Sequence, residues 1–484
     1  MNILTSATHS RLLGAAVATL VGAAVAALVL RWLARNRSPG SLLRHVVDVR
    51  PNEIAAVWTS FVFFFFVLSS YFILRPIRDA VAVSTGVSRL PWLFAGTLIA
   101  MLVANPLFSS LVVRFPVRRF VPITYTFFAA NLLVFFFVMR TTASAQSLGP
   151  YWIGIVFYIW TSVYNLFITS VFWCLMADVF RSEQAKRLFG FIGVGGTLGS
   201  ITGSLLTAVL AQRIGTVNLL LVSVALLETA SLVVARFPRG ASAPSGAIDP
   251  NAEEKPIGGT VWAGITSLTR SPYLLGIAGF QILYTIGSTF LYFELTDIVG
   301  KYFVGAAERT AVLARIEFAV QTLTVITQIF LTGRVIRWLG LAATLALLPA
   351  LTILGFTALG FAPILATVVA FTVLRRGTNF GLTNPAVEVL FTVVPREDKY
   401  KAKSFIETFV YRAGDQIGAW TFKIFVVLAL GVSGAAFGAV PFAVAWLGLG
   451  LWLGRRQGQL AAAERRDDRV LPASLPDGAI PANR

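Results

Sequence analysis

One apolar tract of membrane-spanning length runs directly into a cluster of charges. Residues 54–74 are almost wholly apolar and long enough to cross a bilayer, and the chain then continues with Arg75, Pro76, Arg78 and Asp79. A charge held at the centre of a membrane helix costs about 2.5–3.5 kcal/mol on insertion scales. Proline adds to this by removing a backbone donor and kinking the helix. Charges kept at such a cost indicate a solute path or an ion pair inside a helix bundle.

Composition assigns the chain to the membrane proteins. Of its 484 residues, 56% are hydrophobic and 13% are charged, about half the ~25% charged content of soluble domains. Mean hydropathy is +0.77. Apolar runs of roughly 20 residues recur and are continuous rather than alternating, which excludes a transmembrane β-barrel. The sequence therefore predicts an all-α, polytopic membrane protein.

The residues on which most cofactor and metal chemistry depends are scarce. The chain has a single cysteine, Cys174, and its two histidines, His9 and His45, lie near the N-terminus. No GxSxG or HExxH motif occurs. We therefore expect no enzymatic activity, no cofactor and no metal. The net charge of +18 comes mainly from lysines and arginines in short loops, where membrane orientation signals lie. We expect a lipid bilayer as partner, no nucleic acid, and a monomer.

The apolar runs form two groups of six. The first group comprises about 54–75, 91–113, 120–139, 151–178, 188–211 and 216–235, and the second about 272–298, 310–333, 340–361, 363–394, 404–430 and 434–453. This predicts a major facilitator-like fold of two pseudo-repeated six-helix bundles. The predicted domains are an N-terminal extension (1–50), a first bundle (51–237), a cytoplasmic linker (238–270), a second bundle (271–454) and a disordered cytoplasmic tail (455–484).

Loop charges and the first residues give the expected orientation. Loops of one parity, including the linker and the tail, are rich in lysine and arginine, which predicts that they face the cytoplasm of a bacterial inner membrane. Leu12 to Leu30 is uncharged. It is consistent with an extra membrane helix, an uncleaved signal anchor or a misassigned upstream start, and we place it outside the functional core.

The two groups are similar in sequence. When they are aligned at an offset of about 219 residues, Asn165 corresponds to Asn384 and Gly199 corresponds to Gly418. A constant offset that also superposes the apolar runs favours parallel repeats. The alternative is chance similarity between apolar segments.

Three groups of charges are candidates for binding. Arg75, Arg78 and Asp79 can share one helical face and form an anion clamp in which the acid orients a guanidinium. The alternative is an interfacial anchor whose arginines snorkel to the headgroups. Glu294 follows more than twenty uncharged residues, so it is predicted to face a cavity or a cation. It is a substrate-cation site, a proton site, or the structural partner of a neighbouring arginine.

The third group lies in the tenth apolar run. Arg375 and Arg376 interrupt it, and Asn384 and Glu388 follow. This pattern is typical of a helix interrupted at a water-filled cavity, where positive charge from both halves converges on one anion. A short hairpin with its arginines at the surface is the alternative.

A glycine-rich stretch between Gly190 and Gly203 lacks the GxGxxG pattern and the lysine of a phosphate loop. Gly195, Gly199 and Gly203 recur every four residues instead, which predicts close helix–helix packing in the membrane.

Several ordered segments resemble the ATP/ADP translocase family of plastids and intracellular bacteria, within the major facilitator architecture. The resemblance spans roughly residues 45–455 and rests on 71–79, 171–178, 186–190, 293–295 and 401–406. It implies twelve helices and nucleotide exchange by alternating access. It also implies roles in transport for Arg78, at a basic position of the first helix, and for Glu294, at an acidic position of the seventh.

Two positions depart from that family. Tyr158 stands where the fourth helix of the family carries a glutamate, and Asp415, with Arg412 close by, lies near its late glycine-lysine element. We therefore expect a secondary active transporter of an anionic solute, a nucleotide or related organic phosphate, with ATP/ADP exchange as one form. The alternatives are a proton-coupled carrier of another solute and a non-transporting scaffold or sensor. The candidate substrate-binding residues are Arg75, Arg78, Asp79, Asn165, Glu294, Arg375, Arg376, Asn384, Glu388 and Arg412.

Overall fold

The computed structural model describes residues 49–51, 53–114, 117–142, 149–180, 182–237, 268–269, 271–394, 402–403 and 405–470. All regular structure in these ranges is helical. The predicted N-terminal helix lies outside them, as does the linker 238–270 apart from residues 268–269.

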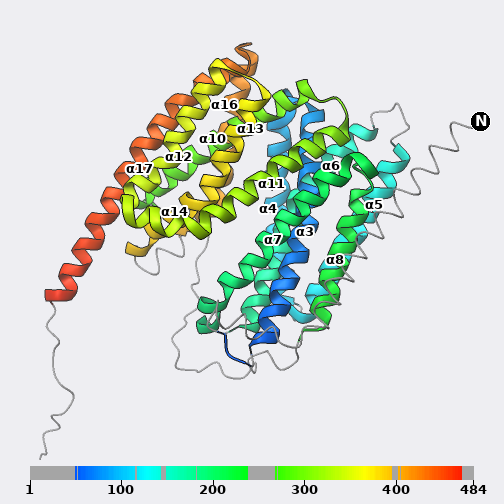
Figure 1. The fold of residues 1–484 in the computed structure, drawn as a ribbon, viewed down its shortest axis with the longest axis horizontal. Helices are drawn as coiled ribbons and strands as arrows, with labels where there is room; N and C mark the ends of the chain where they lie inside the picture. The colour runs from blue at the N-terminus through cyan, green and yellow to red at the C-terminus, as the bar shows by residue number, and fades with distance from the viewer. Residues whose placement is uncertain are drawn as a thin grey trace, which may run out of the picture.

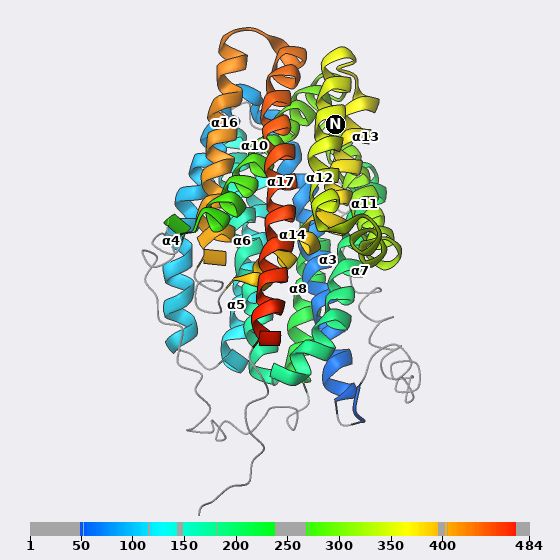
Figure 2. The same cartoon turned by 90° about the vertical axis from the view of Figure 1, so that its left-hand side faces the viewer.

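The described helices form two bundles, and nine of these helices are long and apolar enough to cross a membrane. The first bundle contains α3 (Ile54–Thr85), α4 (Leu90–Arg114), α5 (Val117–Thr142), α6 (Gly149–Val179), α7 (Ser182–Ile214) and α8 (Leu219–Ala235). The second contains α10 (Pro272–Tyr302), α11 (Ala306–Phe330), α12 (Thr332–Phe361), α13 (Leu365–Thr378) followed by α14 (Asn384–Leu390), α16 (Tyr411–Val427) and α17 (Gly431–Val470). In Figure 1 the first bundle lies on the right and the second on the left, and Figure 2 shows the helices running roughly parallel. The predicted all-α, major facilitator-like fold is confirmed.

Two helices extend beyond the predicted apolar runs. The first, α3, continues through Pro76 to Thr85, so the charges after residue 74 lie inside a helix rather than at its end. The last, α17, reaches Val470, whereas the sequence predicts a disordered tail from residue 455. Residues 455–470 include five arginines, three alanines and two glutamines, which are strong helix formers. Helix propensity therefore extends α17 beyond its apolar part.

The glycines of α7 lie against the backbone of α3. A Cβ atom on Gly195, Gly199 or Gly203 would overlap a backbone carbonyl oxygen of α3, those of Phe61, Phe65 and Ser69 respectively. The Ser69 hydroxyl also donates a hydrogen bond to the Gly199 carbonyl oxygen at 3.1 Å. The predicted close helix approach through small residues is confirmed, and it holds α3 rigidly inside the first bundle.

At one end of the molecule the two bundles are packed together. This is the end where α3 stops at Thr85 and α10 stops at Tyr302. The Trp92 and Trp420 rings meet edge to face with centroids 5.1 Å apart, and Arg309 donates to the Ser84 hydroxyl at 3.0 Å. Apolar residues of α3, α4, α10 and α16 form one continuous buried cluster there. No comparable seal joins the bundles among the described residues of the opposite end.

An acidic residue ties the start of α3 to α7. The Glu53 carboxylate accepts hydrogen bonds from the Arg50 backbone N–H (3.0 Å), Gln184 (2.8 Å) and Arg187 (3.1 Å). Burial acts to raise the pKa of Glu53, but these three hydrogen bonds and the Arg187 charge outweigh it, so the pKa lies below its ordinary value of 4.5. Glu53 therefore stabilises the fold as an anion.

We expect Glu53→Gln to lower the thermal unfolding temperature of the purified protein by a few degrees at pH 7. Because the folded-state pKa is depressed, the contribution is present above the unfolded-state pKa and disappears as pH falls through the folded value. The difference from wild type should therefore shrink on acidification below about pH 4.5. An unfolding-temperature difference that stays constant from pH 7 to pH 3 would contradict this assignment.

Candidate functional site

A cavity of about 1360 Å³ lies between the two bundles. Side chains from α3, α4, α6, α10, α11, α13 and the start of α16 line it, so both bundles contribute. The lining extends to Asn105 and Pro106 in α4 and to Glu407 and Phe409 before α16. These residues lie toward the end opposite the apolar seal. The cavity therefore lies on the side of the connections that follow α4 and α14.

One charged group in the cavity centres on Arg78. Its guanidinium contacts the Asp79 carboxylate at 3.2 Å and lies over the Tyr158 ring, 4.7 Å from the centroid. The Ser162 hydroxyl is 3.5 Å away. Asp79 also accepts a hydrogen bond from the Tyr292 hydroxyl of the second bundle at 3.1 Å. A helical turn of α3 thus holds one arginine against an aromatic face and links it, through its acid, to α10.

A second group bridges the bundles through Glu317 of α11. Arg376 of α13 donates two hydrogen bonds to this carboxylate, at 2.7 and 3.1 Å. Arg75 of α3 approaches the same carboxylate at 3.3 Å. Gln321, one turn further along α11, donates to it at 2.9 Å. Two guanidinium groups from opposite bundles therefore share one almost fully buried carboxylate.

A third group lies on α16. Arg412 and Asp415, three residues apart on the helix, form an ion pair at 3.3 Å. The Thr289 hydroxyl of α10 donates to the same carboxylate at 3.4 Å. A π-helical turn over Ile406–Val410 precedes this helix and brings Glu407 to the cavity wall. Such turns are frequent at functional sites because they redirect side chains within a helix.

Arg375 differs from the other arginines. It borders the cavity but is only 1% exposed. Its guanidinium donates to the Thr352 hydroxyl at 3.2 Å and to the Tyr284 carbonyl oxygen at 3.0 Å. The Tyr284 and Trp446 rings lie 5.2 and 5.8 Å from it. This burial rules out a surface hairpin, and the contacts indicate that Arg375 ties α13 to α10 and α12.

The interruption of the tenth span is a π-helical turn. Residues Asn379–Thr383 join α13 to α14 without leaving the helical path. The Asn379 side chain within this turn donates to the Tyr284 hydroxyl at 2.9 Å. Arg376, near the end of α13 and just before this turn, lies on the cavity wall.

Three predicted residues do not line the cavity. Asn384 is exposed, and Glu388 is exposed and paired with Lys403 at 2.7 Å. Glu294 is fully buried, and neither of its carboxylate oxygens has a hydrogen-bond partner among the described residues. The expected cation beside Glu294 is therefore not found there. Asn165, the repeat counterpart of Asn384, does line the cavity, so the two halves do not use this position alike.

Sequence reasoning missed Glu317, which makes the most contacts with arginines. The available signal was an acid in the apolar run 310–333, followed four residues later by Gln321. Arg315 lies two residues earlier in the same run. Glu317 and Arg315 lie on different faces of α11, and only Glu317 is buried.

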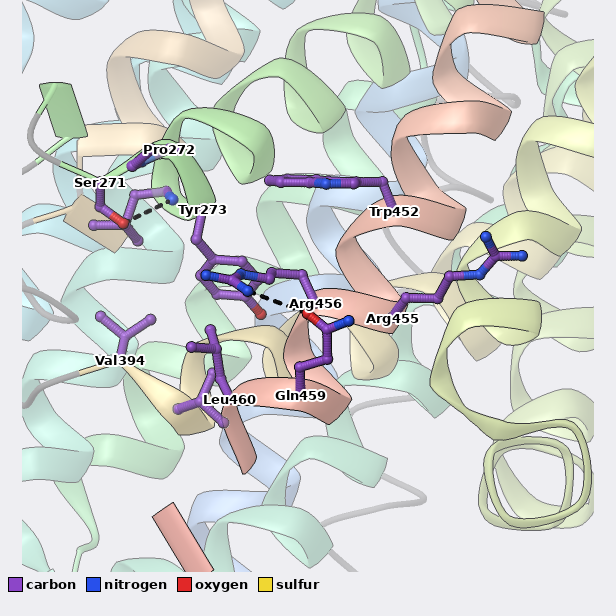
Figure 3. Close-up of a pocket in the computed structure, with 11 residues that line it drawn as sticks. Ser271, Pro272, Tyr273, Val394, Trp452, Arg455, Arg456, Gln459 and Leu460 are labelled. Carbon is purple, nitrogen blue, oxygen red and sulfur yellow. Dashed lines mark hydrogen bonds between the residues drawn. The ribbon is translucent and has the colours of Figure 1, made fainter. Parts of the chain in front are cut away.

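A smaller cavity of about 560 Å³ lies elsewhere, between the start of α10 and residues 452–460 of α17. Figure 3 shows Tyr273, Trp452 and Arg456 around it, with Arg456 donating to Gln459 at 3.1 Å and Arg455 pointing away. The carboxylate-paired arginines of the central cavity take no part in it. Across the described ranges, no cluster of three or more histidine, cysteine or acidic residues could hold a metal.

Comparisons with known proteins point to transport proteins. No protein-family model matches the chain. The ADP,ATP carrier protein 1 of Chlamydia trachomatis serovar D is 21% identical over 448 residues, which cover 78% of this chain and 84% of the carrier. The crystal structure of the nucleoside transporter NupG is similar with a TM-score of 0.56 and 15% identity, covering 84% of this chain and 98% of that one. A bacterial homologue of the human lysosomal transporter Spinster, in an inward-facing and unoccupied conformation, has a TM-score of 0.54 at 12% identity, with 87% and 99% covered.

Proposed function

We propose that this protein is a secondary transporter that moves an anionic organic solute, a nucleotide or related organic phosphate, across a bacterial inner membrane by alternating access. The observation that carries the proposal is the convergence of Arg75 and Arg78 from one bundle with Arg376 and Arg412 from the other on a single cavity. Guanidinium groups bind phosphate and carboxylate bidentately. The distant similarity to an ADP,ATP carrier supports the solute class, and the similar structures support the transport mode. The matched proteins are a carrier and transporters, not enzymes.

The seal and the loop charges together suggest which side is open. The cavity reaches the helix ends that adjoin the arginine- and lysine-rich connections, and the opposite end is packed shut. By the positive-inside rule the basic connections and the C-terminus face the cytoplasm. The structure then represents an inward-open state, from which rocking of the bundles about α7–α11 and α4–α16 would expose the cavity outward.

Transport by the purified protein in proteoliposomes tests the proposal. Vesicles preloaded with one unlabelled nucleotide or organic phosphate are diluted into the same labelled compound, and counterflow is followed across a panel. We expect counterflow of at least one phosphorylated compound that protein-free vesicles lack. If the whole panel of nucleotides, sugar phosphates and organic acids gives no counterflow, the proposal is wrong.

Protonatable carboxylates at the cavity wall favour a second candidate, a proton-coupled carrier. Asp79 and Asp415 both line the cavity, and each has a hydroxyl partner from α10. An imposed pH gradient separates the two candidates. Uptake driven by the gradient into vesicles that contain no counter-solute supports proton coupling, whereas uptake that requires internal solute and ignores the gradient supports exchange.

A further inference from the structure

The charges around the central cavity are nearly balanced before any solute binds. Five arginines line it, namely Arg75, Arg78, Arg375, Arg376 and Arg412, against four acids, namely Asp79, Glu317, Glu407 and Asp415. Apart from the buried Arg375, each of these arginines contacts a carboxylate of the protein itself. An incoming anion therefore meets guanidinium groups that already have partners. It gains full contact with them only by displacing a resident carboxylate.

Asp79 and Asp415 are poorly suited to displacement. Asp79 adjoins Arg78 in sequence, and Asp415 is one helical turn from Arg412. Each pair lies on a single helix and stays together however the bundles move. Asp415 is also held by the Thr289 hydroxyl of its own bundle, whereas the Tyr292 hydroxyl that donates to Asp79 belongs to the other bundle. These acids orient their arginines in every state of the transporter.

Glu317 differs because its partners lie on different bundles. Arg376 belongs to the same bundle as Glu317, whereas Arg75 lies on α3 of the other. Among the described residues, Arg75–Glu317 is the ion pair that joins the bundles directly. At 3.3 Å it is also longer than the 2.7 Å contact with Arg376. A displacement of α3 relative to α11 changes this distance, whereas the pairs held on a single helix keep theirs.

The geometry also imitates a bound anion. The two Glu317 oxygens accept from both arms of the Arg376 fork while one faces Arg75, which is how guanidinium groups hold a phosphate or carboxylate ligand. The Gln321 side chain donates to the same carboxylate, and the Ser200 hydroxyl of α7 donates to the Gln321 side-chain oxygen at 3.4 Å. Hydrogen bonds from Ser200 to Gln321 and from Gln321 to Glu317 thus hold the Glu317 carboxylate at the edge of the cavity.

We propose that Glu317 is an internal counter-anion that occupies a solute subsite between Arg75 and Arg376. A phosphate or carboxylate group of the solute takes its place and becomes the link between the bundles. This inference rests on the proposed transport function and adds to it the subsite and the competing residue. It makes Glu317 a positioning residue that weakens anion binding in the empty protein and thereby allows release.

Anion binding to Glu317→Gln tests the proposal, with inorganic phosphate as the probe. Thermal unfolding of the purified protein is followed at increasing phosphate, with chloride adjusted to keep ionic strength constant. Removing the competing carboxylate should lower the phosphate concentration for half-maximal stabilisation at least tenfold, as expected when two guanidinium groups lose their resident partner. In transport assays the same variant should lower both KM and the maximal rate, because release slows.

Two control variants separate competition from other effects. Glu308→Gln removes an exposed acid at the start of the same helix, outside the cavity. Glu407→Gln removes the same charge from the cavity wall without touching Arg75 or Arg376. We expect less than a threefold change in phosphate affinity for both. Equal tightening in Glu407→Gln would show a general charge effect and overturn the proposal, as would an unchanged or weaker affinity in Glu317→Gln.

A second substitution keeps the proposal testable if Glu317→Gln does not fold. Glu317→Asp keeps the charge but shortens the side chain, so the carboxylate cannot reach both arginines, and phosphate affinity should rise by an intermediate factor. No rise in either folded variant refutes the subsite. The two proposals can fail separately. If Glu317→Gln binds phosphate more tightly but no solute shows counterflow, the subsite stands and transport is refuted. If counterflow occurs but the phosphate affinity of Glu317→Gln is unchanged, transport stands and the subsite is refuted.

Discussion

Gly199→Val is expected to abolish recovery of folded protein. The Cβ of any larger residue at this position would overlap the Phe65 carbonyl oxygen of α3, and a backbone atom cannot move aside as a side-chain tip can. Overpacking costs about 1–3 kcal/mol where side chains can adjust and more where they cannot. We expect a cost above about 3 kcal/mol, seen as loss of the monodisperse peak in size-exclusion chromatography.

Gly193→Val is the matched control on the same helix. A Cβ at Gly193 meets nothing within 4 Å, so this variant carries the same change in propensity without the overlap. It should elute like wild type and unfold within a few degrees of it. Normal yield and stability of Gly199→Val would show that α3 and α7 are not as closely packed as described, and would remove the rigid support of Arg75 and Arg78.

Arg78→Ala is expected to reduce transport at least about 100-fold while leaving the protein folded. The variant removes the guanidinium between Asp79 and the Tyr158 ring. It leaves the Asp79 carboxylate facing the cavity, with the Tyr292 hydroxyl as its hydrogen-bond donor. A charge-assisted contact is worth about 1.5–3 kcal/mol, and an unpaired acid repels an anionic solute in addition. Initial counterflow rates in proteoliposomes, normalised to incorporated protein, measure the effect.

Arg89→Ala controls for the loss of an arginine near the same helix. Arg89 is exposed beyond the end of α3, over the Tyr151 ring, and does not line the cavity. It should transport at close to the wild-type rate. Arg78→Lys, which keeps the charge and loses the planar fork, should fall between the two. Transport by Arg78→Ala at the rate of Arg89→Ala would exclude Arg78 from the solute path.

Continuous apolar runs were sufficient to predict the helices and their grouping, because a bilayer demands a fixed apolar length. The four-residue glycine spacing was likewise sufficient to predict that α7 packs closely on a neighbour. Helix ends were predicted less well. Hydropathy ends α3 at its charges and α17 at Arg455, whereas backbone hydrogen bonding carries both helices further.

Charged residues were easy to find but hard to orient. The sequence marks Arg375 and Arg376 equally, yet one is enclosed by Tyr284 and Trp446 and the other lies on the cavity wall. Which way each points depends on the phase of α13 and its π-helical turn, a tertiary property. Glu317 was missed for the related reason that its partners come from α3 and α13. No local pattern records a contact between residues so far apart in sequence.

The location of the bound solute tests the account most directly. A cryo-electron microscopy map of the protein with a solute that shows counterflow should contain density in the central cavity, within hydrogen-bond distance of Arg78 and of Arg376. Solute density confined to the smaller cavity beside Arg456, with the central cavity empty, would contradict the account.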